Sequence, residues 1–168
     1  MTVEERTREV HPLTLFAPEG ARLLMLGSFP PPRERWRMDF FYPNFQNDMW
    51  RIFGLVFFGD KSHFLTDDGH AFREAELRRF LTERGIAIWD TAMEVSRLQG
   101  NASDKFLEVL RPIDLRQTLA LLPSCRAIAV TGQKALDTLL TLISAPSPPP
   151  KTGEWTDAAL DDRHFRLY

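Results

Sequence analysis

Short, unbroken apolar runs are the most regular pattern along the chain. Four of them read as strands: 22–27 (RLLMLG), 86–90 (IAIWD), 126–132 (RAIAVTG) and 164–168 (HFRLY). Runs that are apolar throughout, rather than alternating, are typical of strands covered on both faces, as in parallel sheets. The pattern therefore predicts four buried strands.

Between these runs the apolar positions recur with a helical period. Helices are predicted over 70–85, 112–123 and 132–143, with another beginning near Asn47 or Asp48. In the first of these, one side carries the apolar residues Phe72, Leu77, Phe80 and Leu81. Segment 101–106 (NASDKF) also reads as a helix start, capped by Asn101 or Ser103 with Asp104 and Glu108 near its positive end. Alternating strands and helices predict an α/β fold with a mainly parallel sheet.

Length and composition are those of one globular domain spanning residues 1–168. No apolar run approaches the roughly 20 residues that span a bilayer. The charged start MTVEERTREV has no apolar core of a signal peptide, and the single Cys125 suits a reducing compartment, so a cytoplasmic location is expected. The Pro-rich stretch 145–153 is expected to be an exposed loop.

Charge limits the functions that the chain can have. The formal net charge of −2 is not that of a protein that binds nucleic acid mainly through phosphates. DNA binding would therefore depend on a specific pocket and a local basic rim, for which Arg33, Arg35 and Arg37 are candidates.

Metal and nucleophile chemistry receive no support from the residue pattern. The four histidines (His11, His63, His70 and His164) are scattered without zinc-ligand spacing, so no metal is expected. No Gly-x-Ser-x-Gly elbow of a serine hydrolase is present. Cys125 precedes a strand and is expected to be buried and inert.

Ligands of parallel sheets bind beyond the carboxyl ends of the strands, which makes the segments after each run the candidates. GSFPPP (27–32) is a rigid loop with backbone N–H groups at Gly27, Ser28 and Phe29, although an ordinary turn is the better explanation of this segment taken alone. Asp90 ends the second run with a carboxylate aimed at the presumed cleft, where it either binds a ligand or bonds a neighbouring loop.

The segment after the third run, TGQKA (131–135), opens a helix. Gly132, Gln133 and Lys134 lie at its N-terminus, where an anion such as a DNA phosphate can bind. An ordinary helix start explains this segment equally well.

FFYPNFQNDMWRIFG (40–54) combines rings with amides. A helix cap at Asn47 and a core of Met49, Trp50 and Phe53 explain part of it. The surplus of Phe41, Tyr42, Asn44 and Asn47 exceeds what one cap requires. An aromatic ring can stack on a nucleobase with about 1–3 kcal/mol, and an amide can pair with a base edge or hold a water. The stretch therefore indicates the wall of a site for a flat, polar ligand.

In this order, LLMLGSFPPP, FFYPNFQNDMW, GIAIWDTAMEVSRLQGNASDKF and AIAVTGQKALDTL resemble the uracil-DNA glycosylase superfamily over about residues 22–168. The mismatch-type and hypoxanthine-DNA glycosylase-like branch is the most similar. The resemblance implies a three-layer α/β/α sandwich around a four-stranded, mainly parallel sheet. It also implies an enzyme that flips a deaminated base out of DNA and hydrolyses its N-glycosidic bond, without metal or organic cofactor.

The resemblance also implies roles for individual residues. It places Gly27, Ser28, Phe29 and Pro30 along the base pocket, and Asp90 is expected to face the same base. Tyr42, together with Phe41, is implied to stack on the base, and Asn47 to position the attacking water. Gly132, Gln133 and Lys134 are the candidates for contact with a DNA phosphate.

Two features depart from the family pattern. The first loop carries neither Asp nor Asn, and the given sequence ends at Tyr168, where the family's Ser/Pro-rich loop after the fourth strand should begin. Either the natural chain continues beyond this residue or this member has lost the loop.

The expected function is that of a monofunctional DNA N-glycosylase of base-excision repair, acting on uracil or hypoxanthine. Its partner would be DNA with a damaged or mismatched base, with no membrane contact and a monomer favoured. One alternative is a non-catalytic nucleic-acid or nucleotide-binding module of the same fold. Another is a small-molecule hydrolase or transferase that uses the same cleft.

Overall fold

The computed structural model describes residues 7–98 and 106–168. Its larger sheet contains β2 (Leu23–Gly27), β3 (Ile86–Asp90), β6 (Ala127–Val130), β7 (Thr156–Leu160) and β8 (Arg163–Leu167). The strand order is β3-β2-β6-β8-β7, and all neighbours are parallel except the antiparallel pair of β7 and β8. The four parallel strands are the four apolar runs of the sequence.

The expected four-stranded sheet is therefore wrong by one strand. β7 is joined to β8 by a tight turn in which Asp161 has φ 53°, and it pairs along the outer edge of the sheet. Its sequence, TDAAL, buries only Ala158 and Leu160 and contains no continuous apolar run. An edge strand with one buried face does not carry the pattern that identifies covered strands.

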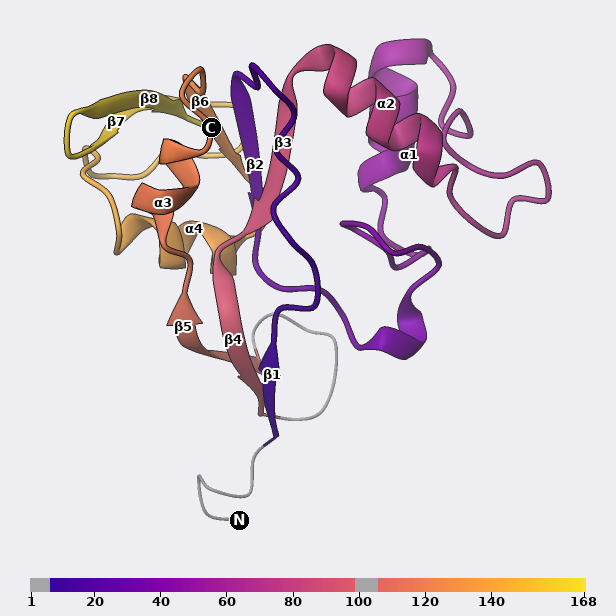
Figure 1. The fold of residues 1–168 in the computed structure, drawn as a ribbon, viewed down its shortest axis with the longest axis horizontal. Coiled ribbons are helices and arrows are strands. Elements are labelled where there is room, and N and C mark those ends of the chain that lie inside the picture. Colours follow the sequence, from indigo (N-terminus) through magenta and orange to yellow (C-terminus); the bar gives the residue numbers. More distant parts are fainter. Residues whose placement is uncertain (1–6, 99–105) are drawn as a thin grey trace.

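Helices cover both faces of this sheet (Figure 1). α1 (Met49–Phe58) and α2 (Glu74–Arg84) lie on one face, and α3 (Leu115–Ala120) and α4 (Gln133–Leu140) on the other. The side chains of β2 alternate between the two cores: Met25 packs with α1 and α2, whereas Leu24 and Leu26 pack with α3 and α4. The fold is thus α/β, and the four helices are those that the periodicity predicts.

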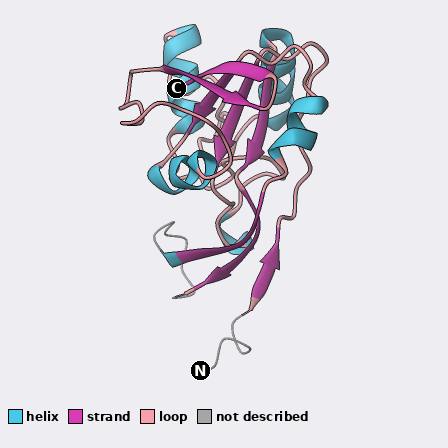
Figure 2. Cartoon of the chain, turned by 90° about the vertical axis from the view of Figure 1, so that its left-hand side faces the viewer, coloured by secondary structure: helices cyan, strands magenta, loops and turns pink. Residues whose placement is uncertain are grey.

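A second, smaller sheet extends the molecule at the carboxyl end of β3 (Figures 1 and 2). It contains β1 (Arg8–Val10), β4 (Ala92–Arg97) and β5 (Leu107–Pro112) in the antiparallel order β1-β4-β5. The chain passes from β3 to β4 through Thr91, so the two sheets share one nearly continuous run of strand. β1 thereby brings the beginning of the chain to the end of the large sheet.

Only the end of the helix start predicted at 101–106 can be compared with the structure. Residues 101–105 lie outside the described residues, and Glu108 belongs to strand β5 rather than to a helix. Leu107 is buried against Val95 of β4 and Phe29, with Val109 beside it, so alternate positions of this segment face a small apolar cluster. Pairing with β4 therefore overrides a local sequence that suits a helix.

Within the described ranges, no helix has both the length and the apolar character needed to cross a membrane.

Candidate active site

A cavity of about 380 Å³ opens at the carboxyl ends of β2, β3 and β6, a size typical of small-ligand sites. Three segments supply most of its wall: 27–31 after β2, 41–49 before and at the start of α1, and 131–132 after β6. Among the predicted site residues, the cavity is lined by Gly27, Ser28, Phe29, Pro30, Phe41, Tyr42, Asn47, Asp90 and Gly132. Residues far apart in the sequence therefore meet where the parallel sheet predicts.

Polar atoms converge on the backbone of Gly27. The parallel register pairs Gly27 with Asp90 of the next strand. A methyl group added to Gly27 would lie 2.7 Å from Asp90 Oδ1, 3.3 Å from the Tyr42 hydroxyl and 3.5 Å from Thr131 Oγ1. Glycine at this position leaves the room that these three groups occupy at the end of the sheet.

Tyr42 is held in an uncommon backbone conformation. Its φ is 51°, in the left-handed region that bulky residues rarely adopt, and Pro43 follows it. Its hydroxyl lies 2.6 Å from Thr131 Oγ1, which in turn donates to the Leu26 carbonyl at 3.4 Å. The ring packs edge-on against Trp50, with 5.6 Å between ring centroids. Such an outlier at a cavity wall is what a functional constraint on a side chain produces.

Asn47 lines the cavity and lies one residue before Asp48, which is the N-cap residue of α1 in place of the predicted Asn47. The exposed side chain of Asn47 accepts the backbone N–H of Met49 at 2.9 Å. Because a backbone amide can only donate, the oxygen of the carboxamide faces the helix. The Nδ2 amino group has no partner in the part of the chain that the structure describes. The bond to the start of α1 and the site proposed at Asn47 are therefore compatible, with the amino group left for a ligand.

The core predicted next to Asn47 has formed. Trp50 is fully buried, and its indole N–H donates to the Phe41 carbonyl at 3.0 Å. Phe41 is also buried and packs edge-on against Trp89. Tyr42 is the less buried of the two aromatic residues, which makes it the better placed to receive a flat ligand.

The loop after β2 offers backbone donors to the cavity. Ser28 and Phe29 line the cavity, and within the described ranges neither backbone N–H has a hydrogen-bond partner. The Ser28 carbonyl, by contrast, accepts the N–H of Ala92 at 3.1 Å, which fixes the loop against β4. Two unpaired amides on a fixed loop can stabilise a carbonyl oxygen or a developing negative charge.

Sequence reasoning missed His11, which follows β1. Its Nε2 lies 2.7 Å from Asp90 Oδ2, and the side chains are 3% and 9% exposed. The two residues are 79 positions apart, and neither spacing nor periodicity connects them. Only the pairing of β1 with β4, continued by a bond from the His11 N–H to the Met93 carbonyl, brings them together.

The predicted phosphate site is only partly at the cavity. Gly132, with φ 101°, lies at the N-terminus of α4 and lines the cavity. Gln133 instead bonds Asp137 on its own helix at 2.8 Å, and Lys134 lines a separate groove beside β5. Successive helical residues project about 100° apart, so Gln133 and Lys134 leave the cavity wall that Gly132 reaches.

A second hollow, of about 360 Å³, adjoins the cavity and shares Asn44 with it. Arg35, Arg37 and His70 line it together with the single acid Glu34. The third arginine of the predicted basic rim, Arg33, instead forms an ion pair with Asp39 at 2.6 Å. We call this hollow the basic hollow.

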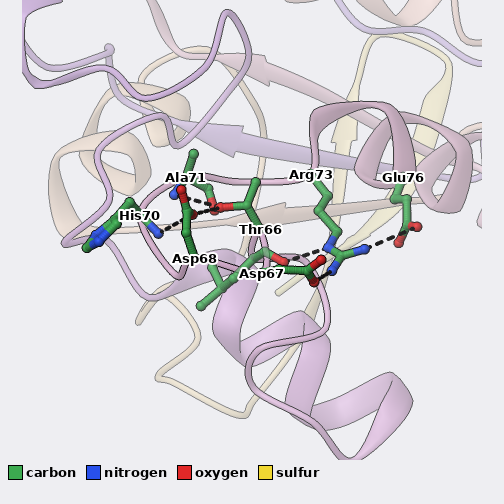
Figure 3. Close-up of polar contacts among 8 residues, drawn as sticks. Thr66, Asp67, Asp68, His70, Ala71, Arg73 and Glu76 are labelled. Carbon is green, nitrogen blue, oxygen red and sulfur yellow. Dashed lines mark hydrogen bonds and ion pairs between the residues drawn. The ribbon is translucent and has the colours of Figure 1, made fainter.

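The loop that presents His70 to the basic hollow is fixed by polar contacts. The Thr66 hydroxyl and the His70 N–H both donate to Asp68 and hold the pKa of this carboxyl below its ordinary value. The far end of the loop is anchored by Arg73, which bonds Asp67 and the Leu65 carbonyl. Figure 3 shows the His70 ring pointing away from the Arg73 end.

Neither metal ligation nor thiol chemistry has a site among the described residues. No group of three or more His, Cys, Asp or Glu side chains is placed to hold a metal ion. Cys125 is buried, and burial raises the pKa of its thiol. A buried thiol with a raised pKa is a poor nucleophile.

Fold and cavity together define the class: a three-layer α/β protein with a cavity at the carboxyl ends of its parallel strands. No protein-family model and no curated protein matches the chain. Among solved structures, it is similar to the solution NMR structure of a "putative Uracil DNA glycosylase" from Methanosarcina acetivorans. The TM-score is 0.57 and the sequence identity 25%, over 77% of this chain and 74% of that one. The chain thus has the fold of the uracil-DNA glycosylase superfamily, which confirms the resemblance predicted from the motifs.

Proposed function

We propose that the protein is a monofunctional DNA glycosylase that hydrolyses the N-glycosidic bond of a deaminated base, uracil or hypoxanthine, flipped out of DNA. The observation that carries the proposal is the shared cavity. Tyr42, Asn47 and Asp90 line it together with Ser28 and Phe29, whose backbone amides are unpaired within the described ranges. The similarity to the structure described as a "putative Uracil DNA glycosylase" supports the same reaction class.

The chemistry needs charge stabilisation rather than a strong base. Breaking the bond builds positive charge on the sugar and negative charge on the departing base. The amides of Ser28 and Phe29 suit the negative charge on a base carbonyl. Asp90, the buried carboxylate of the cavity, suits a contact with the base. Of the three residues predicted to contact a phosphate, Gly132 lines the cavity and keeps this role there, whereas Gln133 and Lys134 lie outside the cavity.

Asn47 is assigned to the water and the leaving base. Its oxygen accepts the N–H of Met49 at the start of α1, so its free amino group donates, either to the base or to the water that attacks the sugar. An amide cannot remove a proton efficiently. The proposal therefore predicts modest catalysis with a preference for weakened pairs, because flipping is least costly there.

The direct test is cleavage of duplex and single-stranded oligonucleotides that each carry one uracil, hypoxanthine or xanthine. Release of the base leaves an abasic site, which alkali converts to a strand break that a gel resolves. Cleavage of uracil or hypoxanthine substrates is expected. A chain that binds these oligonucleotides but releases no base would instead be the non-catalytic binding module of the same fold.

Asn47→Ala tests the assigned role, and Asp48→Ala is the matched control. Both residues are exposed and adjacent, but Asp48 does not line the cavity and its side chain makes no cap bond. Asn47→Ala is expected to abolish cleavage while it lowers stability by about 1 kcal/mol through the lost hydrogen bond to the Met49 N–H. Asp48→Ala is expected to retain activity. Equal activities of the two variants would contradict the role of Asn47.

A further inference from the structure

The contacts of His11 determine its tautomer. The backbone N–H of Leu13 donates to His11 Nδ1 at 3.1 Å, so Nδ1 must carry a lone pair rather than a proton. In the neutral ring the proton then resides on Nε2, which faces Asp90 Oδ2 at 2.7 Å. His11 is therefore a hydrogen-bond donor to the carboxylate.

The ring of His11 is also fixed in position. It packs edge-on against Phe29 at 5.2 Å and lies 4.5 Å from the Trp89 ring, between centroids. Only 3% of the side chain is exposed, and His11 does not line the cavity itself. Among the described residues, the two ring nitrogens of His11 thus contact the Leu13 amide and the Asp90 carboxylate, one each.

In this arrangement the two carboxylate oxygens of Asp90 have different neighbours. Oδ2 is occupied by His11, whereas Oδ1 lies next to the Cα of Gly27 at the cavity. Oδ2 accepts the proton of His11, and both oxygens of an ionised carboxylate can only accept hydrogen bonds. The cavity therefore presents a fixed acceptor, Oδ1, near the unpaired donor amides of Ser28 and Phe29.

An acceptor beside donors matches the edge of a deaminated base. Deamination of cytosine or adenine replaces an amino group with a carbonyl and turns the neighbouring bare ring nitrogen into a ring N–H. The ring N–H can donate to Asp90 while the carbonyl accepts from the loop amides. In the same register, the parent base would place its bare nitrogen against the carboxylate and its amino group against the amides, leaving buried polar groups unpaired.

We propose that His11 is a positioning residue that fixes the Asp90 carboxylate, so that Oδ1 accepts the ring N–H of a deaminated base. The inference rests on the proposed function, because it specifies how that cavity reads its substrate. It goes further by assigning a role to a residue outside the cavity and by naming the base atom that is recognised.

The test compares uracil with its parent base cytosine, which has nearly the same shape but a bare ring nitrogen and an amino group in place of the ring N–H and the carbonyl. Each base is placed in the same oligonucleotide, and the dissociation constant and the single-turnover cleavage rate are measured for both. The ratio of the two bases is then compared among the wild-type protein, His11→Phe and His11→Gln. His11→Phe keeps an aromatic ring in the packed position but removes the donor, whereas His11→Gln restores an N–H.

The wild-type protein is expected to prefer uracil about tenfold or more, as for a directed base contact. His11→Phe is expected to reduce this preference at least severalfold, and His11→Gln to retain it. Asp90→Asn, whose oxygen would face His11 and whose amino group would face the cavity, is expected to lose the preference. Leu119→Ala, in the core on the other face of the sheet, lowers stability without touching the site and should leave the ratio unchanged.

Failure of this inference differs from failure of the proposed function. If the wild-type protein binds both bases equally, or if His11→Phe keeps the full preference for uracil, the inference is wrong even when cleavage occurs. If the preference in binding depends on His11 as stated but no base is released, base reading stands and the glycosylase activity is wrong.

Discussion

Substitution of Gly27 by alanine tests the site at its most crowded point. Gly27 does not have a left-handed φ, so its backbone can accept an alanine. The added Cβ would lie 2.7 Å from Asp90 Oδ1, whereas ordinary contacts begin near 3.4 Å. Relief of the contact therefore requires a movement of about 0.7 Å between the two groups.

The carboxylate is poorly able to provide that movement. His11 holds the other oxygen of Asp90 at 2.7 Å, and the Tyr42 hydroxyl and Thr131 Oγ1 lie 3.3 and 3.5 Å from the new methyl group. Overpacking of this kind costs about 1–3 kcal/mol of unfolding free energy. For a chain of this length, each kcal/mol lowers the melting temperature by about 2–4 °C. The variant should therefore remain folded at 25 °C.

Activity is expected to fall further than stability explains. A displacement on the order of 1 Å at a reacting centre can cost about 100-fold in rate. We expect kcat/KM for a uracil oligonucleotide to fall about 10- to 100-fold at 25 °C, where both proteins are folded. Thermal unfolding followed by circular dichroism and single-turnover cleavage measure the two effects separately.

Leu119→Ala provides the comparison. This buried leucine belongs to the core on the α3 side, and its truncation costs about 2–5 kcal/mol without changing the cavity. It should lower the melting temperature by at least as much as Gly27→Ala but retain activity. Wild-type kcat/KM in Gly27→Ala, or an equal loss of activity in Leu119→Ala, would refute the placement of Asp90 at the reacting centre.

Three further predictions address the remaining surfaces. Tyr42→Ala should weaken binding of a uracil oligonucleotide about 5- to 150-fold through lost stacking; Tyr42→Phe should stay near wild type, and equal losses in a binding assay would argue against stacking. Arg35→Ala with Arg37→Ala should lower the slope of log affinity against log salt by about 0.9 for each lost phosphate contact. Arg79→Ala, at an exposed position on α2, should not change the slope. An unchanged slope in the variant that lacks Arg35 and Arg37 would show that the basic hollow does not contact DNA. Because burial raises the pKa of the Cys125 thiol, its alkylation should be undetectable in the folded protein and rapid in denaturant; fast labelling without denaturant would contradict burial.

The large sheet could be predicted because its four parallel strands are covered on both faces. Leu24, Leu26 and Ile128, for example, are all buried, so the sequence shows continuous apolar runs. β7 has one covered face, and β5 packs against a small apolar cluster. Local sequence patterns do not distinguish such strands from a loop or a helix start. Their pairing depends on the partner strands rather than on their own residues.

The residues of the candidate site also divide into those that the sequence could predict and those that it could not. Gly27, Asp90 and Gly132 could be placed together because each ends or follows a covered strand. The sequence groups Gln133 and Lys134 with Gly132 at one helix start, but only Gly132 of the three lines the cavity, because successive helical side chains point in different directions. His11 could not be found because its partner lies in another part of the sequence, and a lone histidine gives no signal.

The attachment of β1, the strand that His11 follows, determines how the N-terminal end of the protein can be modified. Chain ends are usually the parts that can be trimmed or fused to a tag without harm. Here only three residue pairs, Arg8–Ser96, Glu9–Val95 and Val10–Glu94, join β1 to its neighbour. A shortened variant that begins at residue 12 would keep every strand of the large sheet and still lose the imidazole under the binding site. Tags are therefore better placed at the other terminus, and binding or cleavage measured on such a shortened chain would describe a cavity in which Asp90 lacks its His11 partner.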